Sequence, residues 1–169
     1  MTEVFYSGKT EEVTSVNLVG LGVIFRLAGQ ASGGKFSVVE HPVEPGTLVP
    51  PHTHSREDEY SYVLEGEVGV KVGDQEFLAT VGDIIVKPRG VSHTFWNSGS
   101  QPARLLEIIA PAGFESYFEE MSRVLNVGGP PDEEQMDRIA EKYGITYQME
   151  QIPELVTKYH LHDPTGQRE

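Results

Sequence analysis

Residues 46–66 read GTLVPPHTHSREDEYSYVLEG, and residues 82–97 read GDIIVKPRGVSHTFWN. These two stretches decide the interpretation of the chain because they hold three histidines and an acidic run. His52 and His54 are two residues apart, so in an extended strand both imidazoles point to the same face. Two imidazoles on one face can bind a single ion. The stretches therefore predict a metal site built on strands.

Spacing alone leaves the carboxylate ligand of this site open. Glu59 lies five residues after His54, an odd step that sends its side chain to the opposite face of an unbroken strand. A bulge or turn within residues 55–58 would bring Glu59 back to the imidazole face. Glu57 and Asp58 are adjacent alternatives, so at this point all three carboxylates remain candidates.

His93 is the fourth predicted ligand, and the turn at residues 88–90 presents it at the start of another strand. Period-two alternation places Phe95 and Asn97 on the same side as His93. Three imidazoles and one carboxylate leave one or two exchangeable positions on a six-coordinate ion. That arrangement suits one divalent first-row metal that binds substrate or O₂ (Mn, Fe, Co, Ni, Cu or Zn), and suits a closed structural zinc less well.

The surrounding sequence is typical of an all-β protein. Between residues 16 and 109, short segments rich in Val, Ile, Leu and Phe alternate with turn residues at a spacing of about 8–12 residues. We expect strands near residues 23–27, 35–43, 59–64, 67–72, 75–79, 84–86, 93–97 and 104–109. Such a series predicts a sandwich or barrel.

The period of the apolar residues changes to a helical one after Pro111. The first apolar stripe consists of Phe114, Tyr117, Phe118, Met121 and Leu125. A second helix is predicted before Gly144, its C-cap, and a short third helix after Pro153. These stripes either form a partner-binding surface or pack on the outside of the barrel, and we favour packing. Residues 160–169 are expected to be a frayed tail.

Composition limits the partners. A chain of 169 residues suits one domain, 1–169, with a barrel core at about 16–110 and a helical extension at about 113–160. Its net charge of −13 repels nucleic acid and anionic membranes, so neither is an expected partner. The chain has no cysteine, which excludes thiolate ligands. It shows neither a targeting signal nor a membrane-spanning apolar run, so a cytoplasmic location is expected.

The two quoted stretches resemble the two sequence motifs of the cupins. The first motif (Gly, five residues, His-x-His, three or four residues, Glu, six residues, Gly) matches Gly46, His52, His54, Glu59 and Gly66. The second (Gly, five residues, Pro-x-Gly, two residues, His, three residues, Asn) matches Gly82, Pro88, Gly90, His93 and Asn97. The resemblance implies a jelly-roll barrel, or double-stranded β-helix, with the metal inside. It also implies that the carboxylate ligand is Glu59.

A narrower resemblance covers residues 33–37, 54–59, 62–67, 88–95 and 111–115. These segments are similar to single-domain cupins of the quercetin dioxygenase type. The resemblance implies a metal-dependent dioxygenase that acts on a flavonol-like, enediol or dicarbonyl small molecule, with Glu59 as the base. Phe95 and Ser61 are the predicted pocket residues, and related cupins commonly form homodimers.

Two other classes of function stay open from the sequence. The protein could be a non-redox isomerase or epimerase that uses the ion as a Lewis acid, or a module that binds a metal or metabolite without chemistry. Asn97 is interpreted as a residue that supports the site or the fold. A second His-x-His, at His160 and His162, lacks a downstream carboxylate and is interpreted as non-functional. His41, beside Pro42, is interpreted as a turn residue.

Overall fold

The computed structural model describes residues 14–126 and 132–165. Its strands are β1 (Ser15–Leu18), β2 (Leu21–Leu27), β3 (Ser37–Val43), β4 (His52–His54), β5 (Asp58–Glu65), β6 (Glu67–Val72), β7 (Gln75–Thr80), β8 (Ile84–Lys87), β9 (His93–Trp96), β10 (Ala103–Ala110) and β11 (Ile145–Tyr147). Its helices are α1 (Glu115–Leu125), α2 (Glu133–Tyr143) and α3 (Ile152–Tyr159), with short 3₁₀ turns at Gly29–Ser32 and Met149–Gln151.

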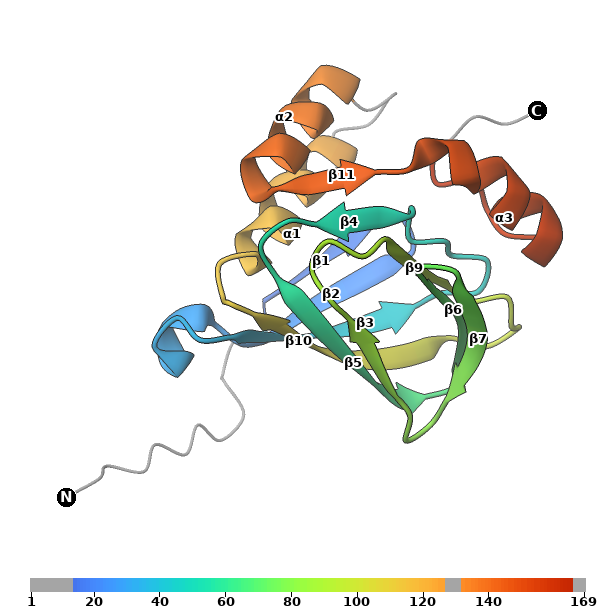
Figure 1. Cartoon of the computed structure of the whole chain (residues 1–169), viewed down its shortest axis with the longest axis horizontal. Helices are drawn as coiled ribbons and strands as arrows, with labels where there is room; N and C mark the ends of the chain where they lie inside the picture. The colour runs from blue at the N-terminus through green and yellow to red at the C-terminus, as the bar shows by residue number, and fades with distance from the viewer. Residues whose placement is uncertain (1–13, 127–131, 166–169) are drawn as a thin grey trace.

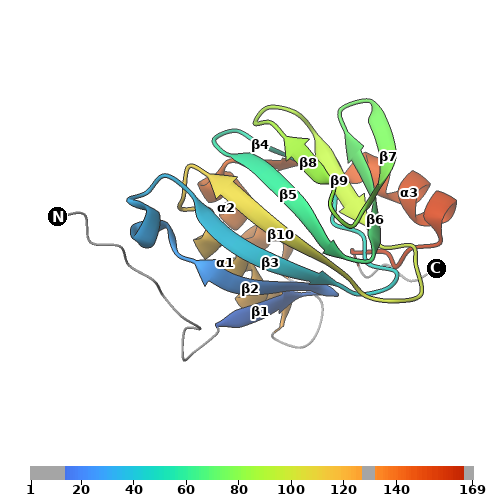
Figure 2. The ribbon, with the colours of Figure 1, turned by 90° about the horizontal axis from the view of Figure 1, so that it is seen from below.

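The strands form two antiparallel sheets that close around a common interior (Figures 1 and 2). One sheet has the order β1-β2-β3-β10-β5-β8, and the other has the order β11-β4-β9-β6-β7. Neighbours in each sheet are often distant in sequence, as a jelly roll requires. The predicted all-β jelly-roll barrel with C-terminal helices is therefore confirmed.

Three strands were not predicted as separate elements, and each is short. β1 has four residues, β11 has three, and β4, the extended segment that carries His52 and His54, has three. β11 nevertheless matters for the site because it pairs with β4, placing Tyr147 opposite His52 and Ile145 opposite His54. Figure 1 shows β11 alongside β4, between the helices α2 and α3. The segment after the barrel thus contributes a strand as well as helices.

Side chains alternate between the two faces of each strand, and the inward-facing ones fill the barrel interior. In β3, the inward residues are Val39, His41 and Val43, all nearly inaccessible to solvent. The interpretation of His41 as a turn residue is wrong, because it sits mid-strand with its Nδ1 2.9 Å from the carbonyl oxygen of Gly22. Burial lowers the pKa of His41 to about 4, so the ring is neutral at pH 7. In the sequence, the neighbouring Pro42 argued against a strand position for His41, because proline is uncommon within strands.

The helix α1 packs its apolar stripe into the protein. Phe114, Tyr117, Phe118 and Met121 join one core cluster with interior strand residues such as Val39. Packing, the favoured interpretation of this stripe, is therefore confirmed. Figure 2 shows α1 and α2 behind the plane of β1, β2 and β3.

The end of the described chain is held more firmly than the sequence suggested. Leu161 is buried in a cluster with Leu48 and Trp96, and the backbone N–H of His162 donates to the carbonyl of Gly46 at 2.8 Å. The expected fraying is thus wrong for residues 160–162, and residues 166–169 lie outside the described residues. No helix in the described part of the chain is long and apolar enough to cross a membrane.

Candidate metal centre

The structure brings the four predicted ligands together inside the barrel. His52 in β4 and His93 in β9 are direct partners across the sheet, and Glu59 comes from β5 of the opposite sheet. One ligand atom from each of His52, His54, Glu59 and His93 lies within 4.8 Å of the others, and all four residues are buried. Within the described ranges, this is the one cluster with the composition of a metal site; His160 and His162 do not form another.

A corner in the chain explains how Glu59 faces the histidines despite its odd spacing from His54 in the sequence. β4 ends at His54, and β5 begins at Asp58 in the other sheet, so the chain changes sheets over residues 55–57. Because the two ligand-bearing strands belong to different sheets, odd spacing no longer sends Glu59 away from the histidines. The break expected within residues 55–58 is present.

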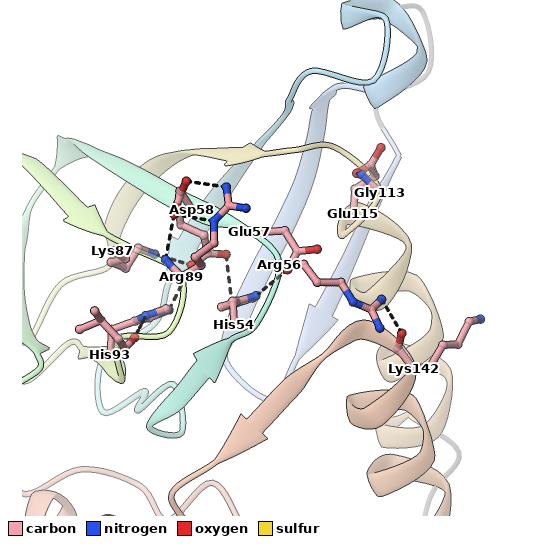
Figure 3. A network of polar contacts seen from close by, with 12 residues as sticks. His54, Arg56, Glu57, Asp58, Lys87, Arg89, His93, Gly113, Glu115 and Lys142 are labelled. Carbon is pink, nitrogen blue, oxygen red and sulfur yellow. Dashed lines mark hydrogen bonds and ion pairs between the residues drawn. The ribbon is translucent and has the colours of Figure 1, made fainter.

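The other two acidic candidates point elsewhere. Asp58 faces outward and forms an exposed ion pair with Arg89, whose hydrogen bonds lower the pKa of Asp58 to about 2. Glu57 is buried, but its Oε2 approaches His54 from the Nδ1 side, at 3.4 Å. Figure 3 shows His54 between Glu57 on one side and His93 on the other. Glu59 is thus the carboxylate directed at the three imidazoles.

Backbone carbonyls set the orientation of two imidazole rings. The Nδ1 atom of His52 lies 2.7 Å from the carbonyl oxygen of Pro50, and that of His93 lies 3.2 Å from the carbonyl oxygen of Val91. A carbonyl accepts a hydrogen bond, so each Nδ1 carries the proton and each Nε2 has a free lone pair. Such anchoring is the usual support of metal-ligating histidines.

Several atoms at the centre lack a hydrogen-bond partner. Nε2 of His54 and of His93 are buried without one. They lie 3.5 Å and 3.2 Å from the two carboxylate oxygens of Glu59. Buried polar atoms without partners are costly, and a shared cation would satisfy all of them at once. The donor set and its orphaned atoms therefore fit a divalent transition metal.

The pKa shifts of His52, His93 and Glu59 suit metal binding, whereas that of His54 opposes it. Burial, together with the neighbouring histidines, lowers the pKa of His52 well below its ordinary value, and burial lowers that of His93. Burial alone would lower the pKa of His54 as well, but the Glu59 and Glu57 carboxylates raise it. Burial alone would raise the pKa of Glu59, but Lys87 and His54 hold it well below its usual range. Neutral imidazoles and an ionised carboxylate are the forms that bind metals.

The remaining predicted site residues lie in the interior, and some of them are already engaged in hydrogen bonds with other residues. Phe95 is buried on the same face as His93, with its ring centroid 5.4 Å from Nζ of Lys87. Ser61 also points inward, but its hydroxyl already donates to Oε2 of Glu107 at 2.6 Å. Asn97 stabilises a loop: its amide donates to the carbonyls of Val43 and Gln101 and accepts from the N–H of Gly99.

Two charged residues of the interior were missed from the sequence. Lys87 and Glu107 are buried, and Nζ of Lys87 lies 2.9 Å from Oε2 of Glu107 and 3.0 Å from Oε2 of Glu59. Burial raises the pKa of Glu107 to about 7, although Lys87 opposes that shift. The sequence did contain a pattern that indicates the position of Glu107. It alternates with Leu105 and Ile109, so its charged side chain points to the same inward face as theirs.

Aromatic side chains from the segment after the barrel cover one side of the metal centre. The ring of Phe114 meets that of His54 edge-on at a centroid distance of 4.5 Å. Tyr147 of β11 lies 6.1 Å from His52, ring centroid to ring centroid, and its hydroxyl shares a hydrogen bond with that of Tyr117 in α1. The amphipathic pattern of α1 predicted a buried face but gave no indication that this face begins beside the histidines.

Comparison with known proteins places these features in a family context. The family model for the cupin domain matches residues 39–109, which include all four clustered residues. The chain is 45% identical over 67 residues to germin-like protein subfamily 2 member 2 of Arabidopsis thaliana, covering 37% of this chain and 31% of that protein. It is 36% identical over 123 residues to putative germin-like protein 3-2 of Oryza sativa subsp. japonica, covering 68% and 53%. The chain thus spans about a third to a half of these relatives.

Solved structures show the same fold. A predicted oxalate decarboxylase from Thermotoga maritima superposes with a TM-score of 0.57 at 24% identity, covering 63% of this chain and 99% of that one. An RmlC-like cupin from Shewanella frigidimarina superposes with a TM-score of 0.53 at 24% identity, covering 68% and 96%. At this identity the likeness concerns the fold alone.

Proposed function

We propose that the protein is a metal-dependent dioxygenase acting on a flavonol-like, enediol or dicarbonyl small molecule, on the premise that residues 39–109, which match the cupin domain model, form a cupin domain. The observation that carries the proposal is the convergence of three imidazoles and one carboxylate on a buried point inside the barrel. His52, His54, Glu59 and His93 would hold the ion. Four protein ligands leave positions on a six-coordinate ion for small molecules.

A bound first-row metal would supply Lewis acidity toward substrate oxygen atoms and electron transfer with dioxygen. The chain itself supplies the enclosure. Phe114 beside His54 and Phe95 farther inside give the centre apolar, aromatic walls, which suit a planar substrate and exclude water. Ser61 would shape the interior, since its hydroxyl is engaged by Glu107.

The low basicity of Glu59 limits the protons that it can accept from a substrate. Because Lys87 and His54 hold the pKa of Glu59 well below its ordinary range, this carboxylate is a weak base. We propose that it accepts the proton of an enolic hydroxyl, which is far more acidic than that of an ordinary alcohol. Flavonols, enediols and the enols of β-dicarbonyl compounds share such a hydroxyl.

An isomerase or epimerase acting on a hydroxylated small molecule is the second candidate. The interior argues against a phosphorylated substrate of that kind. Among the described residues, Lys87 is the one buried Lys or Arg, and Glu59 and Glu107 already neutralise it. A phosphate group inside the barrel would thus meet carboxylates and no free cation of the chain. A binding module without chemistry is the third possibility.

An oxygen electrode separates the three functions. The protein is loaded with each first-row metal in turn, and at least one loaded form is expected to consume oxygen when given flavonols, enediols or β-dicarbonyl compounds. Glu59→Gln is expected to lose roughly 100-fold or more of that rate, as loss of a general base does, when both proteins are compared at a metal concentration that saturates their sites. Equal turnover without oxygen would favour the isomerase. Stabilisation by a compound with no product would favour the binding module.

We also propose that the protein forms a homodimer through the outer face of the larger sheet. Exposed apolar side chains gather there on β5, β8 and β10: Tyr60, Tyr62, Ile84, Val86 and Ile108. They are neighbours across the strands, since Tyr60 pairs with Val86 and Ile108, and Tyr62 with Ile84. β8 ends this sheet, so a second copy can cover the apolar face and pair with its free edge.

Light scattering tests the dimer. The wild-type protein is expected to have twice the mass of one chain, and a Tyr62→Lys, Ile84→Lys double variant is expected to have the mass of one. Leu78→Lys is the matched control, because Leu78 is 58% exposed on β7 of the other sheet. A monomeric wild-type protein, or a double variant that stays dimeric, would refute this interface.

A further inference from the structure

Lys87 connects the metal cluster to a second carboxylate. Its Nζ lies 3.0 Å from Oε2 of Glu59 and 2.9 Å from Oε2 of Glu107, and its side chain is 3% exposed. Oε2 of Glu107 also accepts a hydrogen bond from Ser61 at 2.6 Å. The four side chains therefore form a continuous buried chain, Ser61–Glu107–Lys87–Glu59, that ends at the three histidines.

The register between the strands of the larger sheet brings these four side chains together. β5 pairs with β8 so that Glu59 is opposite Lys87, and with β10 so that Ser61 is opposite Glu107. Glu59 and Ser61 are two residues apart, so both face inward, and so do their partners. A contact just beyond the end of β8 makes the contrast clear: Asp58 of β5 and Arg89, in the turn after β8, face outward and form an exposed ion pair.

The contact with Lys87 constrains Glu59. An ammonium held at hydrogen-bonding distance by Oε2 limits rotation of the carboxylate and leaves Oε1 as the oxygen without a lysine partner. Lys87 cannot move away freely, because Glu107 would then be a buried carboxylate without its cation. Supporting contacts of this kind fix the geometry of metal ligands in other proteins.

We propose that Lys87 is a positioning residue that fixes the orientation of the Glu59 carboxylate toward the three histidines, and that Glu107 and Ser61 hold Lys87 in place. The inference rests on the metal-binding part of the proposed function and is independent of any reaction with oxygen. It predicts that Glu59 binds the ion through one oxygen. The arrangement leaves more of the ion free for a substrate with two oxygen atoms.

Metal affinity and the visible spectrum of Co²⁺-loaded protein test the proposal without any activity assay. Lys87→Met keeps the length of the side chain and removes its charge. Lys87→Met with Glu107→Gln also removes the carboxylate that would be left without a cation, so it protects folding. Both variants are expected to bind Co²⁺ about 10–100-fold more weakly, as loss of a supporting contact does elsewhere. Their d–d absorption bands are expected to shift.

Arg89→Met is the matched control, since it removes the outward ion pair between β5 and the turn after β8, and it should change neither readout. Ser61→Ala is expected to weaken binding less than Lys87→Met does. If the double variant folds and keeps wild-type affinity and spectrum, Lys87 does not position Glu59. A loss of thermal stability with an unchanged spectrum likewise reduces Lys87 to a structural role. Wild-type protein that binds no Co²⁺ overturns the inference, whereas Co²⁺ binding without oxygen consumption contradicts only the proposed reaction.

Discussion

Replacing His93 with alanine is expected to reduce the affinity for a divalent first-row metal by at least about 100-fold, because loss of a supporting contact alone costs about 10–100-fold. His93 is a suitable position because its Nε2 lies 3.2 Å from Glu59 and has no hydrogen-bond partner. Isothermal titration calorimetry with the metal-free protein measures the change directly. The metal should also stabilise the wild-type protein by about 2.7 kcal/mol at 100 times its dissociation constant, and the variant much less.

The chain offers its own control for this experiment. His162 belongs to a second His-x-His pair, but it lies at the end of the described chain, away from any acidic cluster of the required composition. His162→Ala should therefore leave both the affinity and the metal-dependent stabilisation unchanged. Equal loss in both variants would mean that the measured metal binds adventitiously to surface histidines.

Replacing Phe114 with alanine is expected to lower the free energy of unfolding by about 3–5 kcal/mol. Phe114 is 2% exposed and packs against His54, Tyr117 and Phe118. Its removal leaves a cavity where α1 meets the metal centre. Denaturant unfolding of metal-free protein, followed by tryptophan fluorescence from Trp96, measures the loss.

Phe77→Ala is the matched control for the same chemical change. Phe77 is 41% exposed on β7, so its replacement should cost about 1 kcal/mol or less. If the two variants lose the same stability, Phe114 does not anchor α1 to the barrel. The contrast also tests whether the segment after the barrel is part of one cooperative structure with the metal centre.

The ligand set could be predicted because it depends on local features. His52 and His54 share a strand, and His93 follows a turn, so spacing and turn chemistry were sufficient for these three. The choice of Glu59 over Glu57 needed the family resemblance, since a change of sheet at residues 55–57 is not encoded in strand parity. Most strand positions followed from apolar periodicity and glycine-containing turns for the same local reason.

Contacts across strands distant in sequence could not be predicted. The pairing of Lys87 with Glu59 depends on the register between β8 and β5, and that of Glu107 with Ser61 on the register between β10 and β5. No short segment specifies either register. β11 escaped prediction for a related reason: three residues show no measurable period, and the strand exists because β4 offers it an edge.

The most direct test of the central claim is a metal titration of the metal-free wild-type protein, with the bound metal counted by elemental analysis. The buried cluster of three histidines and Glu59 predicts one divalent first-row ion per chain, bound tightly enough to survive gel filtration. Less than about a tenth of an ion per chain for every metal from Mn to Zn would contradict it, because a site of this composition is expected to be near full occupancy.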